Sequence, residues 1–343
     1  MPEPYFQLAL GDRREALEVA AQELGRPAAI IEKDIYVVWA LSALERATYA
    51  DHLVFKGGTS LSKAHALIDR FSEDVDLTYD LRAFAPDLIA TGTVEGWPRS
   101  RSQADRWSTA LLGRLGTWIS TTCAEHVRST AKHDGVAMRV DAFVDPKRHR
   151  HDLFLLYESA AVERVEYVSP AVRLEFGARG TGEPNQRCTI RTDASTTRAL
   201  SAVTFPQASF ATLAAERTLW EKATAAHAFC LQASFRGAHG FARHWYDLAR
   251  MHDSSMATAA IRNRRLAHEV ARWKSLFFRE RGVDYVLAVT GDLRIVPDGG
   301  ALDALRDDYE RMRGAGLTPS TAPTFEAVLA ECAALEVAAN AGA

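Results

Sequence analysis

The segment from Leu53 to Tyr79 constrains the fold more than any other part of this 343-residue chain. The apolar run Leu53 to Phe55 predicts a strand, and the pair Gly57-Gly58 predicts a tight turn after it. Apolar residues at helical spacing between Thr59 and Ile68 predict a helix, and Val75 to Tyr79 predicts a second strand. A strand, turn, helix and return strand in so short a segment indicate a mixed α/β fold.

The acidic pair Asp74 and Asp76 stands at the start of the second predicted strand. Because alternate residues of a strand share a face, the two carboxylates are expected to point the same way. Carboxylate oxygens are preferred ligands of Mg²⁺, so the pair predicts a site for a divalent metal. The alternative is a solvated strand end, since Asp is common beside turns.

The Gly-Gly turn predicts a phosphate-binding loop. Gly57 and Gly58 allow backbone N–H groups to approach an anion, and Ser60 offers a hydroxyl donor. Lys63 is a further candidate for phosphate binding, although a surface lysine would fit the pattern equally well. The alternative for the turn is a plain strand-to-helix connection with Thr59 as the helix N-cap.

Several segments together carry a resemblance to a known family. They are Phe55-Lys-Gly-Gly-Thr-Ser-Leu-Ser-Lys63, Arg70-Phe-Ser-Glu-Asp-Val-Asp-Leu77, Leu219-Trp-Glu-Lys-Ala223, Arg243-His-Trp-Tyr-Asp-Leu248, Ile31-Glu-Lys-Asp34 and Ile295-Val-Pro-Asp298. In their residues and their order along the chain, these segments resemble the AbiEii/AbiGii-type nucleotidyltransferase toxin family, which includes the MenT toxins. The resemblance runs from about residue 28 to the C-terminal helix. This chain has Trp245 where the family usually has Tyr.

The resemblance implies a metal-dependent enzyme that transfers a nucleoside monophosphate from an NTP to an acceptor hydroxyl and releases pyrophosphate. It implies Mg²⁺ or Mn²⁺ as cofactor, RNA as acceptor with the tRNA 3′ end favoured, and a toxin role in toxin–antitoxin or phage-defence systems, opposed by an antitoxin protein. Two alternatives remain open at this point. One is the same chemistry on a small-molecule or protein hydroxyl, and the other is a non-catalytic relative that binds NTP or RNA.

The resemblance also implies roles for residues outside the first segment. Lys222 would neutralise the triphosphate, and Asp247 would be a catalytic-site acid that orients Lys222. A third acid is expected on a later strand, where Glu175 in Val-Arg-Leu-Glu-Phe is the first choice and Asp141 the second. A plain salt bridge is the alternative for Lys222.

Charge is distributed unevenly along the chain. The range 236–281 holds ten Lys or Arg against four Asp or Glu, although the whole chain carries a net charge of −3. A basic segment in an acidic protein is a candidate RNA-binding surface. A solvated helix face with local salt bridges would show the same count.

Composition sets the remaining expectations. No apolar run is long enough for a membrane span, and the N-terminus lacks a signal-peptide pattern. The four cysteines have no paired spacing, which is typical of a cytoplasmic protein. The distribution of predicted elements indicates two domains. These are a nucleotidyltransferase-like α/β domain with a mixed sheet, flanking helices and N-terminal helices at 1–207, and a mainly helical domain at 208–343.

Overall fold

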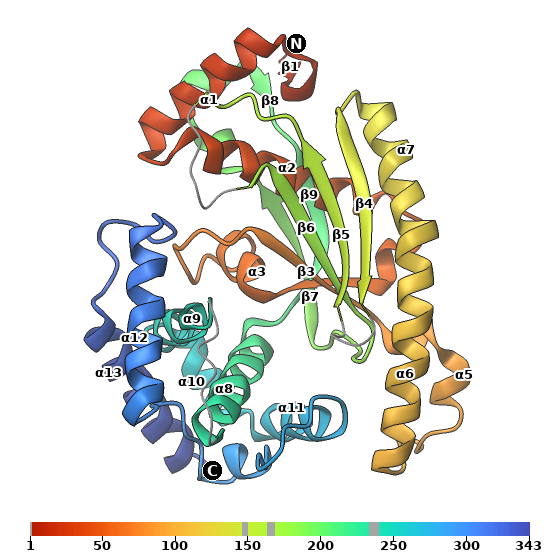
Figure 1. Cartoon of the computed structure of the whole chain (residues 1–343), viewed down its shortest axis with the longest axis vertical. Helices are drawn as coiled ribbons and strands as arrows, with labels where there is room; N and C mark the ends of the chain where they lie inside the picture. The colour runs from red at the N-terminus through yellow and green to blue at the C-terminus, as the bar shows by residue number, and fades with distance from the viewer. Residues whose placement is uncertain (1, 146–149, 163–168, 233–239) are drawn as a thin grey trace. The chain divides into compact units, whose positions relative to one another are not determined.

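The computed structural model describes residues 2–145, 150–162, 169–232 and 240–343 (Figure 1). The chain forms two compact units. The first contains residues 1–64, 73–96 and 106–212, and the second contains residues 65–72, 97–105 and 213–343. The longest stretch of the second unit begins at Leu213, and two short segments from the N-terminal half belong to the same unit.

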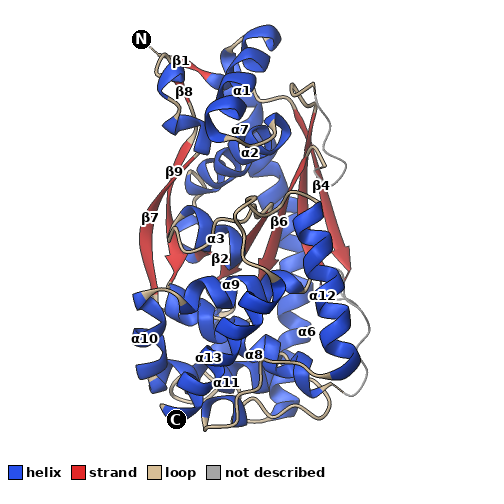
Figure 2. Ribbon diagram, turned by 90° about the vertical axis from the view of Figure 1, so that its left-hand side faces the viewer, coloured by secondary structure: helices blue, strands red, loops and turns tan. Residues whose placement is uncertain are grey.

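The first unit is built on a seven-stranded mixed sheet, which stands out from the helices by colour in Figure 2. The strands, in their order in the sheet, are β4 (Met138–Asp145), β5 (Arg150–Tyr157), β6 (Ala171–Gly177), β3 (Asp74–Tyr79), β2 (Leu53–Lys56), β9 (Gln207–Leu213) and β7 (Asn185–Arg191). The central strand β3 pairs antiparallel with β2 and parallel with β6. The mixed α/β fold is thus confirmed.

The two faces of the sheet differ in character. Val75 and Leu77 of β3 and Leu174 of β6 are fully buried, in one core cluster with residues of α2 (Ala28–Glu45) and α7 (Ala124–Asp134). The alternate residues of β3 and β6 are mostly polar and project to the opposite face. Period-2 alternation therefore places charged side chains together on one face of the sheet.

A second core cluster lies around the N-terminal helices. Helix α1 (Leu10–Leu24) ends at Gly25, whose φ of 62° is the left-handed conformation that glycine adopts easily. Leu17 of α1, Ile31 and Ile35 of α2 and Phe205 belong to this cluster. The two-residue strands β1 (Glu3–Pro4) and β8 (Val203–Thr204) form a separate parallel pair.

Helix α6 (Arg101–Trp118) continues through a π-helical turn at Ile119–Cys123 into α7. Two single-turn helices, α4 (Leu81–Phe84) and α5 (Pro86–Ile89), precede α6.

The second unit is helical. Its helices are α8 (Ala215–Leu231), α9 (Ala242–His252), α10 (Ser255–Arg262), α11 (Arg264–Phe277), α12 (Gly299–Gly314) and α13 (Phe325–Ala341). No helix among the described residues is both long enough and apolar enough to cross a membrane.

Three local expectations were wrong. The helix α3 spans Gly57–Lys63 and stops well before Ile68, because Ala66 adopts a positive φ of 52° that no α-helix contains. Strand β7 lies in a stretch with no expected strand. Strand β9 lies where the chain was expected to be helical.

Candidate functional site

The carboxylates of Asp74 and Asp76 lie on the same face of β3, as the strand period requires. Both residues are half-buried, and the intervening Val75 is fully buried on the other face. The strand holds them near the middle of the sheet, where Asp76 pairs with Lys56 of β2 on one side and Glu175 of β6 on the other.

The turn at Gly57 is packed directly against Asp76. Gly57 has a φ of 78°, and a Cβ atom added there would lie 2.0 Å from Oδ2 of Asp76. A side chain at this position would require the Asp76 carboxylate to move, so glycine is what lets the backbone lie so close to it. The Gly-Gly turn and the acidic strand are therefore in direct contact, as their proximity in sequence indicates.

Polar side chains of α3 form hydrogen bonds with β3 and within the turn that precedes the helix. The Thr59 hydroxyl donates a hydrogen bond to the carbonyl oxygen of Asp74. Ser60 is fully buried, and its hydroxyl donates to the carbonyl oxygen of Gly57 at 2.8 Å. The Ser60 hydroxyl, expected to donate to phosphate, is thus used inside the turn.

Lys63 also has protein partners. Its ammonium group forms ion pairs with Asp34 and, at 2.7 Å, with Asp193. Burial alone would lower the pKa of Lys63, but the two carboxylates outweigh it and raise the pKa. This geometry favours a structural role for Lys63, which links α3 to α2.

The motif Ile31-Glu-Lys-Asp34 supplies buried charges that support this region. Glu32 accepts a hydrogen bond of 2.6 Å from the backbone N–H of Ala160, and Lys33 forms an ion pair of 2.5 Å with Glu73. Lys33 is almost completely buried. Its contact fixes the residue immediately before Asp74, a function that the sequence pattern alone did not indicate.

The two candidates for a third acid occupy different places on the same sheet face. Glu175 pairs in register with Asp76 on the neighbouring strand, whereas Asp141 pairs with Phe154 and lies on β4, three strands away. Asp141 forms an ion pair with Arg139 at 2.8 Å. The register therefore favours Glu175.

Two charged residues that the sequence reasoning missed complete this face. Asp152 of β5 is fully buried and lies in register with Glu175. Arg173 of β6 contacts Glu175 at 2.6 Å, Asp152 at 3.1 Å and, more distantly, Asp74 at 3.7 Å. The sequence signal for Asp152 is an acid directly before the apolar run Leu153–Tyr157, because β5 begins at Arg150 and includes it.

The acidic face fits a divalent metal in its donor chemistry. Asp74 and Asp76 offer hard oxygen ligands, and the missing Cβ of Gly57 lets the backbone of the turn lie directly against the Asp76 carboxylate. The described residues contain no cluster of three or more His, Cys, Asp or Glu side chains with metal-binding geometry. Two carboxylates are nonetheless a usual protein contribution to Mg²⁺ when substrate phosphates supply further ligands.

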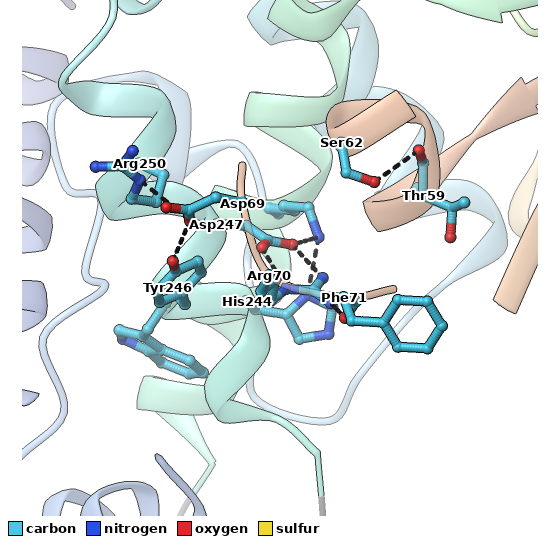
Figure 3. A network of polar contacts seen from close by, with 12 residues as sticks. Thr59, Ser62, Asp69, Arg70, Phe71, His244, Tyr246, Asp247 and Arg250 are labelled. Atoms are coloured by element: carbon cyan, nitrogen blue, oxygen red, sulfur yellow. Dashed lines mark hydrogen bonds and ion pairs between the residues drawn. The ribbon is translucent and has the colours of Figure 1, made fainter. Parts of the chain in front are cut away.

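A separate charged cluster lies in the second unit around Asp247 of α9 (Figure 3). Asp247 is fully buried and forms two hydrogen bonds of 2.7 Å with the guanidinium group of Arg70. Lys222 of α8 contacts the same carboxylate at 2.8 Å. The expected contact between Lys222 and Asp247 is therefore present, and Arg70 is a partner that sequence reasoning missed.

Burial and charge shift the ionisation of this cluster. Burial alone would raise the pKa of Asp247, but the charges of Arg70 and Lys222 outweigh it and hold the pKa well below its ordinary value. Burial lowers the pKa of Lys222, and the charge of Arg70 adds to this effect. His244 lies 3.4 Å from the Lys222 ammonium through Nδ1, and burial together with the charges of Lys222 and Arg243 lowers its pKa strongly.

The predicted site residues thus form two groups. Gly57, Gly58, Asp74, Asp76 and Glu175 come together on and beside the sheet of the first unit, while Lys222 and Asp247 come together in the second.

Comparisons with known proteins bear on the family to which this chain belongs. The family model described as "Nucleotidyl transferase AbiEii toxin, Type IV TA system" matches residues 39–331. Among solved structures, the chain is similar to MenT4, a nucleotidyltransferase toxin from Mycobacterium tuberculosis H37Rv, with 16% identity and a TM-score of 0.46 over 95% of this chain and 87% of that one. No curated protein gives a significant match. Because the family model covers most of the sequence, this chain belongs to the AbiEii family of nucleotidyltransferase toxins of type IV toxin–antitoxin systems.

Proposed function

We propose that this nucleotidyltransferase toxin is metal-dependent and transfers a nucleoside monophosphate from an NTP to the 3′ end of an RNA, with tRNA as the favoured acceptor. The observation that carries the proposal is the contact between the Gly57 backbone and the Asp76 carboxylate, because it joins a turn suited to phosphate with a carboxylate suited to a metal.

Asp74 and Asp76 would hold the metal, which supplies charge neutralisation at the phosphates when it is bound. The hydroxyl oxygen of the acceptor forms a bond to the α-phosphorus, and the bond from that phosphorus to the bridging oxygen breaks. Pyrophosphate leaves with the electron pair, and the hydroxyl proton passes to a base. Glu175, in register with Asp76, is our first candidate for this base.

Lys222 is proposed as the cation that stabilises negative charge on the triphosphate, as the family motif implies. Its support is the nearly buried ammonium group held by Asp247 at 2.8 Å, since charge fixed in a dry environment acts strongly on a transition state. Asp247 would act as a positioning residue that holds Lys222.

The family description supports an antitoxin partner, and a role in phage defence is part of the proposal. A small-molecule or protein acceptor is the alternative that the same chemistry allows.

The test is incubation of the protein with each labelled NTP and total RNA in the presence of Mg²⁺, followed by a denaturing gel. We expect one NTP to label an RNA band, and we expect chelation of the metal to abolish the label. Asp74→Ala and Asp76→Ala should abolish labelling without lowering the melting temperature much, because each removes one of two neighbouring like charges.

The third acid is tested by a matched pair in the same assay. Glu175→Gln should lower the rate far more than Asp141→Asn. Label on protein or on a small molecule, with none on RNA, would replace the RNA acceptor by the alternative. Full activity of Asp76→Ala at saturating Mg²⁺ would reject the metal site itself.

A further inference from the structure

A concave basic pocket lies at the start of α6, within the second unit. The cavity has a volume of about 350 Å³, and its lining includes Arg99, Arg101 and Arg272 together with the hydroxyl groups of Ser100 and Ser275. None of its lining residues is acidic. In a chain with a net charge of −3, three guanidinium groups around one cavity mark a local site for anions.

Anion binding in this pocket would not rest on the α6 helix dipole alone. Ser100 accepts a hydrogen bond of 3.2 Å from the backbone N–H of Gln103, and the Gln103 side chain accepts one of 2.6 Å from the N–H of Arg99. These two hydrogen bonds resemble a capping box, although Gln103 accepts from the residue before Ser100, and they occupy backbone donors at the helix start. An anion in this pocket would therefore be bound mainly by the arginine side chains.

Arg272 carries a second feature of nucleic-acid sites. Its guanidinium group lies over the ring of Trp97 at 4.8 Å from the centroid. A stacked guanidinium keeps its N–H edge for phosphate, and an aromatic ring beside basic groups is a common platform for unpaired bases.

Several basic residues of the range 236–281 have partners within the protein. Arg264 donates a hydrogen bond to the carbonyl oxygen of Val289 and lies over Trp220, so it serves packing. Arg279 forms an ion pair with Asp105, and Lys274 covers the rings of Trp273 and Phe278. Arg236, where the range begins, lies outside the described residues.

We infer that the pocket formed by Arg99, Arg101 and Arg272 binds backbone phosphate of the acceptor RNA. The inference rests on the proposed function, because it assigns a surface to the RNA that function requires. The phosphates of the free NTP offer the same chemistry, so the experiment separates the two sources.

The test variant is Arg99→Gln/Arg101→Gln/Arg272→Gln. Its control is Arg187→Gln/Arg294→Gln/Arg311→Gln, which removes the same charge from three arginines that are each more than half exposed and paired with an acid elsewhere. Binding of bulk tRNA is measured without NTP across a salt series, and the KM for NTP is measured in the labelling assay.

We expect the pocket variant to bind tRNA more weakly than the control and to show a salt slope about 2–3 units less steep than the wild type, because three phosphate contacts are lost. Its KM for NTP should match that of the wild type. The triple Arg→Lys variant should recover much of the slope, since it keeps the charge.

Equal tRNA affinity and equal slope in the pocket and control variants would overturn the inference. A raised KM for NTP with unchanged tRNA binding would also overturn it and assign the pocket to nucleotide. Absence of RNA labelling by the wild type would reject the proposed function instead, and that result is independent of the variants. Melting temperatures of all variants confirm that folded proteins are compared.

Discussion

At the scale of single residues, Gly57 is the position with the least freedom to change. It has a positive φ, and its missing side chain is what allows the backbone to contact the Asp76 carboxylate. Gly25 has a similar φ of 62°, but a Cβ atom there would meet nothing within 4 Å. A comparison of substitutions at the two glycines therefore distinguishes the cost of a left-handed backbone from the cost of a clash with a neighbouring side chain.

We predict that Gly25→Ala lowers the free energy of unfolding by about 1–2 kcal/mol, the cost of a left-handed conformation for a residue with a side chain. Gly57→Ala should lower it further, because its Cβ atom would also clash with the Asp76 carboxylate. Only Gly57→Ala should abolish nucleotide transfer, because it displaces Asp76. Stability is measured by urea denaturation and activity by the labelling gel. Retained activity in Gly57→Ala would show that the turn does not position this carboxylate.

Lys222 gives a second prediction at this scale. Lys222→Ala should lower kcat/KM for NTP by roughly 10²–10³-fold, as expected when a preorganised charge is lost from a site. Lys222→Arg should lose less, because it keeps the charge although its larger fork fits the buried site poorly. Asp247 stays held by Arg70 in both variants. Equal kcat/KM in all three proteins would make Lys222 purely structural.

His244 predicts a dependence of stability on pH. Its pKa in the folded protein lies well below 6.5, so the unfolded chain binds more protons as the pH falls below about 6.5. The free energy of unfolding should therefore decrease on acidification from pH 6.5, before the carboxylates titrate. His227 has a lowered pKa for the same main reason, burial.

Urea denaturation at several pH values checks this prediction. His244→Asn and His227→Asn should each flatten the pH dependence of stability, and each unit of pKa depression corresponds to about 1.4 kcal/mol. An unchanged slope in His244→Asn would mean that this ring is not kept neutral by the fold.

At the scale of secondary-structure elements, the segment 65–72 is anchored to α9 by the bond between Arg70 and Asp247. The carboxylate is fully buried and receives both guanidinium hydrogen bonds and the Lys222 ammonium. Breaking a buried pair by removing one partner is costly because the remaining charges stay buried.

We predict that Asp247→Ala lowers the free energy of unfolding by about 3–5 kcal/mol. Asp303→Ala on the exposed side of α12 is the control and should change it by less than about 0.5 kcal/mol. A denaturation midpoint for Asp247→Ala close to that of the control would show that the cluster adds no stability.

The sequence predicted the elements whose signals are local. Strands β2 and β3 and the shared face of Asp74 and Asp76 follow from alternation within a few residues. Strand β7 escaped prediction because, among its residues, only Ile190 is buried, so no apolar alternation marks it. Strand β9 does alternate, but the helical pattern that follows it hid the signal.

Contacts between residues far apart in the sequence could not be predicted from local sequence patterns. Arg70 lies 177 residues before Asp247, and nothing near either residue indicates the other. Asp152 and Arg173 join the acidic face only because the register of three strands places them beside Asp76 and Glu175. The motif residues of the candidate site could therefore be predicted from the sequence, but the charged residues that contact them could not.

At the scale of the whole molecule, the two units do not correspond to two continuous halves of the chain. The second unit contains residues 65–72, which carry Arg70, as well as 213–343. Its helices also depend on late residues, since Cys332 of α13 donates a hydrogen bond to the carbonyl oxygen of Trp245 in α9.

We predict that the fragment 213–343 is markedly less stable alone than the same unit in the full chain, because Asp247 loses Arg70. Addition of the separately produced fragment 1–212 should restore cooperative unfolding and activity together. Calorimetry of each fragment and of their mixture checks this. A fragment 213–343 that melts cooperatively at the temperature of the full protein would contradict it.

This interleaving also affects synthesis on the ribosome. Arg70 emerges long before Asp247, and the last helix, α13, contributes to the packing of α9. A growing chain therefore lacks some of the partners of its second unit until α13 has been translated. A product truncated before α13 lacks the Cys332 contact to α9, so the packing of the second unit is completed only once this helix has been made.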